Sequence, residues 1–207
     1  MEQAAAVGLC VAFVGGVVWV VVSSPEPPRD PEDLCAVFRE KPRWHDAARA
    51  SADRWGVSEA ALLAIVFQES SFRADARPPR RLWLGVLPGF RLSSAYGFGQ
   101  VLDATWQEYL EAGTRPGARR DRIADVLDFI GWYAAAIERR AGVPRTSVRE
   151  LYLAYHEGPS GYARGHHREK PLVLAAASRV EVRARRYESQ YAGCRADLER
   201  RSWLPFL

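Results

Sequence analysis

The stretch "ALLAIVFQESSF", residues 61–72, decides the fold and carries one carboxylate in an otherwise apolar run. Leu62, Ile65 and Glu69 follow one another at steps of four residues or fewer, the spacing of one face of an α-helix. Glu69 therefore shares a face with core residues, where an ionised carboxylate must find a donor or keep its proton to a higher pH than usual. A carboxyl group still protonated near neutral pH can act as a general acid. The alternative is that Glu69 turns out to water or pairs with Arg73.

The helical period continues from residue 41 onward, and no stretch sustains the alternation of a strand. We therefore predict an all-α domain, whose helices are delimited by proline, glycine and hydroxyl residues. We expect helices from Pro42 to Gly56, from Ser58 to about Phe72, and from about Ile123 to Ala141, where Gly142 ends the helix. A fourth helix should follow a capping box of Ser147 and Glu150, and a fifth should begin after Pro171.

Length and composition favour one domain with a short appendage. The chain has 207 residues, of which 48% are hydrophobic, enough for one ordinary core. Its net charge of +4 is modest and its arginines are scattered, so nucleic acid is not an expected partner. An arginine-rich solvated surface explains the charge, and the alternative is attraction to an anionic polymer such as a cell wall.

The N-terminal segment has a different composition from the rest. Residues 4–22 contain no charged side chain, and their length is about that of a helix that crosses a bilayer's hydrocarbon core. We expect an uncleaved membrane anchor, with a signal peptide as the alternative, because Glu2 without any basic neighbour fits neither pattern fully. The expected division is an anchor or signal over 1–24, a Pro-rich linker over 25–40, the domain over 41–194 and a tail over 195–207.

Two of the three cysteines lie at opposite ends of the predicted domain. Cys10 falls within the apolar segment, which leaves Cys35 and Cys194. If the domain is exported, a disulfide between these two would close most of it. The alternative is two unpaired thiols in a cytosolic domain.

Three segments, taken in order, resemble the signature segments of the lytic transglycosylases of the soluble-lytic-transglycosylase type, relatives of goose-type lysozyme. They cover nearly the whole predicted domain: "ALLAIVFQESSF" (61–72), "AYGFGQVLDATW" (95–106) and "YLAYHEGPSGY" (152–162). The resemblance implies a lysozyme-like, goose-type helical fold and a lyase that acts on peptidoglycan glycan strands. Together with the uncharged residues 4–22 as a membrane contact, it predicts a location on the periplasmic face of a bacterial inner membrane or free in the periplasm, and it leaves open whether envelope machinery is a further partner.

The resemblance assigns a role to individual residues. Glu69 would be the sole catalytic acid and base, with Ser70 beside it. Tyr155 matches the family tyrosine that hydrogen-bonds the catalytic carboxylate, and His156 and Glu157 replace a common Asn-Ala pair. The segment that lines the sugar groove in the family corresponds to Gly97, Phe98, Gly99 and Gln100, and the turn after the tyrosine to Gly158 and Pro159.

One acid suffices for the implied reaction. It protonates the glycosidic oxygen, and its carboxylate then takes the proton of the sugar's own 6-hydroxyl, which closes a 1,6-anhydro ring. Asp75, Asp103 and Glu157 are candidate second carboxylates, and one of them facing Glu69 would favour hydrolysis, as in a lysozyme. A further alternative is a non-catalytic wall-binding scaffold.

No cofactor or metal is expected. The adjacent histidines of "GHHREK", residues 165–170, do not make a full ligand set. The span "RPPRRLWLGVLPGFRLSS", residues 77–94, is longer than usual for the family. It could form a groove wall, a membrane- or partner-facing flap, or a hairpin packed on the core.

Overall fold

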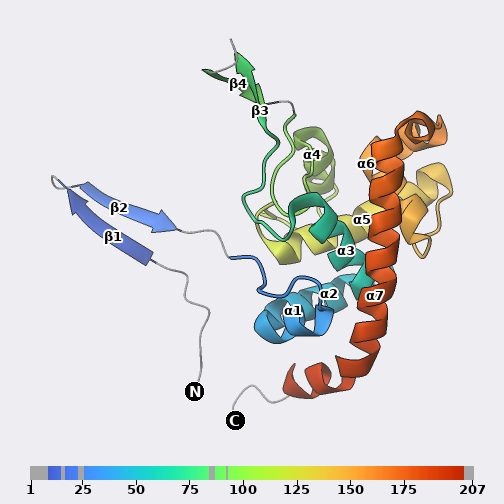
Figure 1. The fold of residues 1–207 in the computed structure, drawn as a ribbon, viewed down its shortest axis with the longest axis horizontal. Helices are drawn as coiled ribbons and strands as arrows, with labels where there is room; N and C mark the ends of the chain where they lie inside the picture. Colours follow the sequence, from blue (N-terminus) through green and yellow to red (C-terminus); the bar gives the residue numbers. More distant parts are fainter. Residues whose placement is uncertain (1–8, 15–16, 23–25, 84–86, 92, 203–207) are drawn as a thin grey trace.

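A computed structural model describes residues 9–14, 17–22, 26–83, 87–91 and 93–202 of the chain. Helices dominate from residue 41 onward, as predicted, and one further helix precedes that point (Figure 1). The helices are α1 Leu34–Glu40, α2 Pro42–Trp55, α3 Glu59–Ser70, α4 Asp103–Glu111, α5 Ile123–Ala141, α6 Val148–Ala163, the short 3-10 helix η1 His166–Glu169, and α7 Pro171–Ser202. The described strands form two antiparallel hairpins, β1 Leu9–Val14 with β2 Val17–Val22, and β3 Arg80–Trp83 with β4 Leu87–Arg91.

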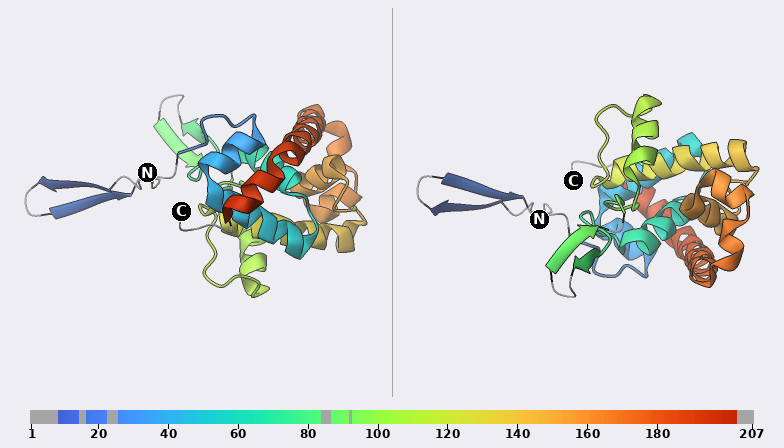
Figure 2. Two further views of the ribbon diagram at one scale, coloured as in Figure 1. Left: turned by 90° about the horizontal axis from the view of Figure 1, so that it is seen from below. Right: turned by 90° about the horizontal axis from the view of Figure 1, so that it is seen from above.

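Helix α3 lies at the centre of the core. Every residue from Ala60 to Val66 is buried, because α3 packs along α7 and also contacts α2 and α5. A helix covered on all sides needs no polar face, which explains why this segment reads as continuously apolar. Figures 1 and 2 show α7 running along the length of the helical domain beside α3 and α6. The core thus encloses the Glu69 helix from Ala60 to Val66, and the turn that carries Glu69 follows directly.

The predicted helix ends are largely confirmed. Pro42 begins α2, and Gly56 ends it with a left-handed φ of 70°. The Ser58 hydroxyl accepts the Ala61 amide at 3.2 Å, which caps α3, and α5 ends at Gly142. The capping box at the start of α6 is wrong: Ser147 is the N-cap residue but makes no side-chain cap bond.

Two expected boundaries differ from the structure. The segment expected as a linker over 25–40 contains α1, in which Leu34, Val37 and Phe38 are fully buried. The spacing of these three residues is helical, but the prolines before them concealed it. At the other end α7 continues to Ser202, and Leu198 still belongs to the core.

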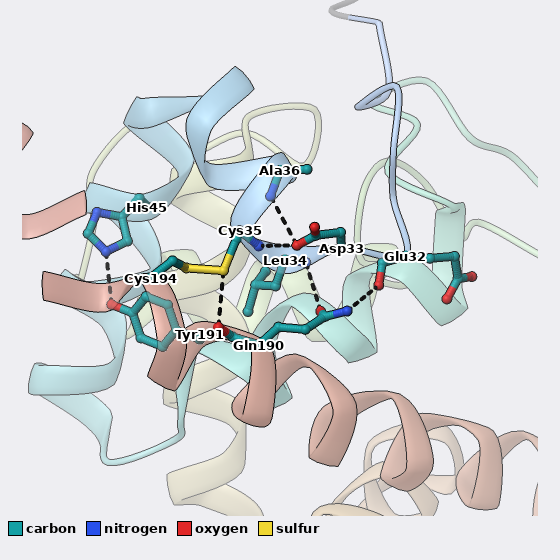
Figure 3. Close-up of a disulfide and its surroundings, with 9 residues drawn as sticks. All are labelled: Glu32, Asp33, Leu34, Cys35, Ala36, His45, Gln190, Tyr191 and Cys194. Carbon is teal, nitrogen blue, oxygen red and sulfur yellow. Dashed lines mark hydrogen bonds between the residues drawn. A yellow bond between two sulfur atoms is a disulfide. The ribbon is translucent and has the colours of Figure 1, made fainter. Parts of the chain in front are cut away.

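The predicted disulfide is present. Cys35 of α1 is bonded to Cys194 of α7 across 159 residues of sequence (Figure 3). Asp33 caps α1 by accepting the amides of Cys35 and Ala36, and Gln190 accepts the Leu34 amide at 3.0 Å. Covalent and polar contacts therefore fix the start of α1 to the same part of α7.

The apolar N-terminal segment is not the single helix expected over 4–22. Strands β1 and β2 pair antiparallel, from Leu9 opposite Val22 to Val14 opposite Val17. Valine is the commonest residue in both strands and favours extended backbone, and two glycines separate the strands in the sequence. In the described part of the chain no helix has the length and apolar character that a membrane span requires.

Candidate active site

Glu69 lies in the last turn of α3, directly before a sharp change in chain direction. The helix ends at Ser70, and the next two residues, Ser71 and Phe72, have left-handed φ angles of 51° and 62°. Such angles cost roughly 1 kcal/mol or more for residues other than glycine, so the surroundings must hold them. Phe72 is fully buried, with its ring against those of Trp44 and Phe67. Core packing therefore forces the turn that ends the helix beside Glu69.

The carboxyl group of Glu69 has the electrostatic setting of a general acid. Its Oε1 atom is buried and has no hydrogen-bond partner among the described residues, although the residue as a whole is partly exposed. Burial raises the pKa of Glu69 to about 7, and a hydrogen bond with Tyr152 opposes this rise. A large share of the molecules therefore carry the proton at neutral pH. The expectation that Glu69 lies with the core face of its helix agrees with this geometry.

The tyrosine that hydrogen-bonds Glu69 is Tyr152 and not the expected Tyr155, whose own pKa is raised by burial and by the nearby charge of Glu69. The Tyr155 hydroxyl instead donates to the carbonyl oxygen of Gly99 at 2.7 Å. A tyrosine hydroxyl has one proton to donate, so Tyr155 serves the backbone and Tyr152 the carboxyl group. The two tyrosines lie three residues apart on α6 and so share one face. That spacing was the only sequence signal for Tyr152, and it did not show which hydroxyl reaches Glu69.

A tight turn over residues 96–100 lies next to these tyrosines. Gly97 has a φ of 78°, and a Cβ atom there would lie 2.0 Å from the Arg120 carbonyl oxygen. A Cβ atom at Gly99 would lie 3.0 Å from the Tyr155 hydroxyl. The side-chain amide of Gln100 donates to the carbonyls of Ala76 and Gly97, both at 2.9 Å. Gly97 is therefore required by its φ and by the close approach of the Arg120 backbone, Gly99 leaves room for the side chains of Val126 and Tyr155, and Gln100 locks the turn.

Two expected site residues have structural contacts instead. Phe98 is buried and packs edge-on against Trp44, so it belongs to the core and does not line a groove. Ser70 is also buried, and its hydroxyl donates to the Val66 carbonyl one turn earlier at 3.1 Å. Both residues support the segments that carry Glu69 and Gln100.

His156 and Glu157 form a cluster with Lys170. The Lys170 ammonium lies 2.7 Å from Glu157 Oε2, and His156 Nδ1 lies 3.2 Å from Glu157 Oε1. Burial acts to raise the pKa of Glu157, but the hydrogen bonds and charges of Lys170 and His156 outweigh it and lower that pKa. Glu157 is therefore an ionised structural partner that joins α6 to the start of α7.

The other candidate second carboxylates are also paired. Asp103 lies 2.7 Å from the Arg120 guanidinium, and Asp75 lies 3.8 Å from that of Arg73. Both aspartates are exposed. Glu69 thus differs from all three, because burial raises its pKa and no cation pairs with it among the described residues.

The adjacent histidines also have local partners. His167 stacks on the Tyr162 ring with centroids 4.8 Å apart, and His166 Nε2 accepts from Arg164. Across the described part of the chain, no three His, Cys, Asp or Glu side chains gather closely enough to hold a metal ion.

Comparison with protein families adds an independent finding. A family model described as "Transglycosylase SLT domain" matches residues 7–194. The chain belongs to this family. The resemblance of the three segments to lytic transglycosylases is thereby confirmed, and the helical fold fits a lysozyme-like domain of this family. A search of curated proteins finds no match. Family membership assigns the chain to peptidoglycan lytic transglycosylases and implies peptidoglycan as the substrate.

Proposed function

We propose that this family member cleaves the β-1,4 bond between N-acetylmuramic acid and N-acetylglucosamine, with Glu69 as the only catalytic acid and base. The observation that carries the proposal is the buried Glu69 carboxyl group, whose pKa is raised to about 7 beside Tyr152. The protonated group donates to the glycosidic oxygen, and the bond to the leaving sugar breaks through an oxocarbenium-like transition state. The resulting carboxylate then takes the proton of the muramic acid 6-hydroxyl as that oxygen closes the 1,6-anhydro ring. The proton and the electron pairs balance without water.

The ion pairs of the other carboxylates support ring closure over hydrolysis. A two-carboxylate glycosidase needs a second carboxylate free to act as a nucleophile or base. Asp75, Asp103 and Glu157 each bind a basic side chain. Ring closure requires only the group that Glu69 supplies.

The domain is further proposed to act outside the cytoplasm, at the periplasmic face of an inner membrane or free in the periplasm. The Cys35–Cys194 disulfide supports this location, because disulfides persist mainly in oxidising compartments. The residues 4–22, which carry no charged side chain, are the proposed membrane contact, and envelope machinery is the proposed further partner. A reporter active only in the periplasm, fused after Leu207, tests the location. A fusion active only in the cytoplasm would contradict it.

Purified sacculi test the reaction. Wild-type protein should release soluble muropeptides whose ends are 1,6-anhydro, one water lighter than reducing ends by mass spectrometry. Glu69→Gln should fold and release none, because an amide cannot deliver the proton. Reducing ends would show a hydrolytic lysozyme. Absence of release by the folded wild type would contradict an enzyme and leave the non-catalytic wall-binding scaffold as the alternative.

A further inference from the structure

The span between Ala76 and Leu102 carries the excess positive charge of the whole chain. It contains four arginines, Arg77, Arg80, Arg81 and Arg91, and no acidic residue. The remaining 25 basic residues balance the 25 acidic residues elsewhere. Within this span the residues from Leu82 to Phe90 are uncharged and mostly apolar. Charge and apolar character are thus combined in one short segment.

The β3–β4 hairpin separates these two characters along its length. Arg80 pairs with Arg91 at the end near the helical domain, whereas Trp83 pairs with Leu87 at the far end. Leu82 and Pro88 pair between them. Figure 1 shows the hairpin extending away from the helices. The backbone therefore places arginines at the base of the hairpin and apolar residues towards its far end. The hairpin projects from the domain, so the alternative of a hairpin packed on the core is wrong.

The base of the hairpin is fixed to the active-site turn. The Gly97 amide donates to the Ala76 carbonyl at 2.9 Å, just before the hairpin begins. The Arg77 guanidinium lies over the Tyr96 ring, 4.0 Å from its centroid. On the other leg, the Ser94 hydroxyl accepts the Asp103 amide at 3.1 Å. The hairpin is thus rooted on the segment that carries Gln100.

We propose that the β3–β4 hairpin binds the surface of an anionic lipid bilayer. The far end of its strands, with Trp83 and Leu87, would enter the interface, where Trp and Leu side chains are favoured, and its basal arginines would lie at the level of the phosphates. Charge complementarity is the argument for this occupant, since each arginine near an anionic membrane gains attraction that a neutral surface does not provide. A sugar strand is the weaker fit, because the residues from Leu82 to Phe90 offer it few polar side chains. The proposal does not depend on the catalytic role of Glu69.

A local label tests this contact in the full chain. Residues 4–22 are also apolar, so vesicle binding of the whole protein would not show which segment touches lipid. The chain carrying Cys10→Ser and Leu87→Cys retains the Cys35–Cys194 disulfide and offers one thiol for an environment-sensitive fluorophore. The control places the same thiol at the exposed Ala175 of α7. With vesicles of phosphatidylcholine and phosphatidylglycerol, emission from residue 87 should shift to shorter wavelength and be quenched by nitroxide-labelled lipid, while emission from residue 175 should not change.

A matched pair of charge variants tests the arginines. In the chain labelled at residue 87, the further substitutions Arg80→Gln and Arg91→Gln should each lower the partition constant for vesicle binding by about 5-fold. Arg43→Gln with Arg139→Gln removes the same charge from two exposed positions on α2 and α5 and should leave the response at residue 87 unchanged. Circular dichroism should show the same helix content in both pairs.

Three outcomes would overturn the proposal. The first is an unshifted label at residue 87 with the phosphatidylglycerol vesicles. The second is an equal shift with pure phosphatidylcholine, since the anionic surface would then be irrelevant. The third is a shift on addition of purified sacculi in the absence of lipid with none on vesicles, which would identify the hairpin as a wall of the glycan groove.

Discussion

At the residue scale, the raised pKa of Glu69 links catalysis to stability. Burial lifts this pKa from 4.5 to about 7, so the folded state holds the proton more tightly than the unfolded state. The stabilisation is fully present below about pH 4.5 and is lost as the pH rises through about 7. Its size is at most about 3 kcal/mol, from about 1.4 kcal/mol per pH unit. A general acid in this position therefore reduces stability in the pH range where the carboxylate forms.

Glu69→Gln isolates this contribution. The amide does not ionise, so the variant does not lose this stabilisation as the pH rises. The free energy of unfolding of the variant minus that of the wild type should therefore increase between about pH 4.5 and 8, by up to about 3 kcal/mol. Chemical denaturation of both proteins across this range measures the difference, in which titrations common to both cancel. A constant difference would mean that Glu69 has an ordinary pKa in the folded protein.

The two tyrosines of α6 should give different phenotypes. Tyr152 lowers the pKa of Glu69 through its hydrogen bond, so Tyr152→Phe should raise that pKa and move the alkaline limb of the pH–rate profile upward. Tyr155→Phe removes the donor to the Gly99 carbonyl and should cost about 1 kcal/mol of stability without moving that limb. Profiles of kcat/KM against pH for both variants test the assignment. If the alkaline limb moved in Tyr155→Phe and not in Tyr152→Phe, the tyrosine that hydrogen-bonds Glu69 would be Tyr155.

The sequence predicted the acid at this scale but not its contacts. Helical spacing put Glu69 in line with Leu62 and Ile65 but left open that it turns out to water or pairs with Arg73, and the resemblance of the three segments decided for the acid. The choice between Tyr152 and Tyr155, and the burial of Phe98, depend on ångström-scale packing between segments far apart in the chain. A local pattern does not contain that information.

At the element scale, α6 is kinked at one glycine. Gly158 has φ 73° and ψ 156°, a conformation essentially limited to glycine, and Pro159 follows it. A Cβ atom there would meet no heavy atom closer than the Tyr133 hydroxyl at 3.8 Å. The space is therefore free, and a substitution would meet backbone strain alone.

Gly158→Ala should consequently lower the free energy of unfolding by about 1 to 3 kcal/mol. The matched control is Gly193→Ala in α7, where a Cβ atom has no neighbour within 4 Å. That variant should raise stability by about 1 kcal/mol, because alanine is the better helix former. Thermal denaturation of both variants tests the pair. Equal effects of the two substitutions would show that the kink is not needed for folding.

The elements predicted best are the helices whose ends are marked by proline, glycine or a capping hydroxyl residue. Pro42, Gly56, Ser58 and Gly142 fixed the ends of α2, α3 and α5, because caps and left-handed ends act within a few residues. The sequence did not reveal α4 as a helix, and for residues 77–94 it left a hairpin as one of three alternatives. At the start of α4, Asp103 forms an ion pair with Arg120, 17 residues further along the chain, and a local pattern does not show such a contact.

At the scale of the whole molecule, one row of α7 side chains holds the chain that enters the domain. Arg183, Tyr187, Gln190 and Cys194 follow one another at steps of four or three residues, and each contacts the segment between Pro31 and Cys35. Arg183 pairs with Glu32, Tyr187 donates to the Pro31 carbonyl, and Gln190 also donates to the Glu32 carbonyl. The disulfide thus closes an interface that polar contacts already align (Figure 3).

Removing the disulfide should therefore separate two sources of stability. In the chain-entropy model a cross-link over 159 residues contributes on the order of 4 to 5 kcal/mol, a large share of the roughly 5 to 15 kcal/mol that stabilises an ordinary domain. Cys35→Ser with Cys194→Ser should lower the midpoint of denaturation accordingly and make it insensitive to reductant, whereas Cys10→Ser should behave as wild type.

Because the α7 row would still contact Pro31 and Glu32, the folded variant should keep α1 docked, which hydrogen exchange of the Leu34 amide can measure. An unchanged midpoint would show that the unfolded chain gains little freedom when the bond is absent. Rapid exchange at Leu34 in a folded variant would show that the polar row does not hold α1 without the covalent bond.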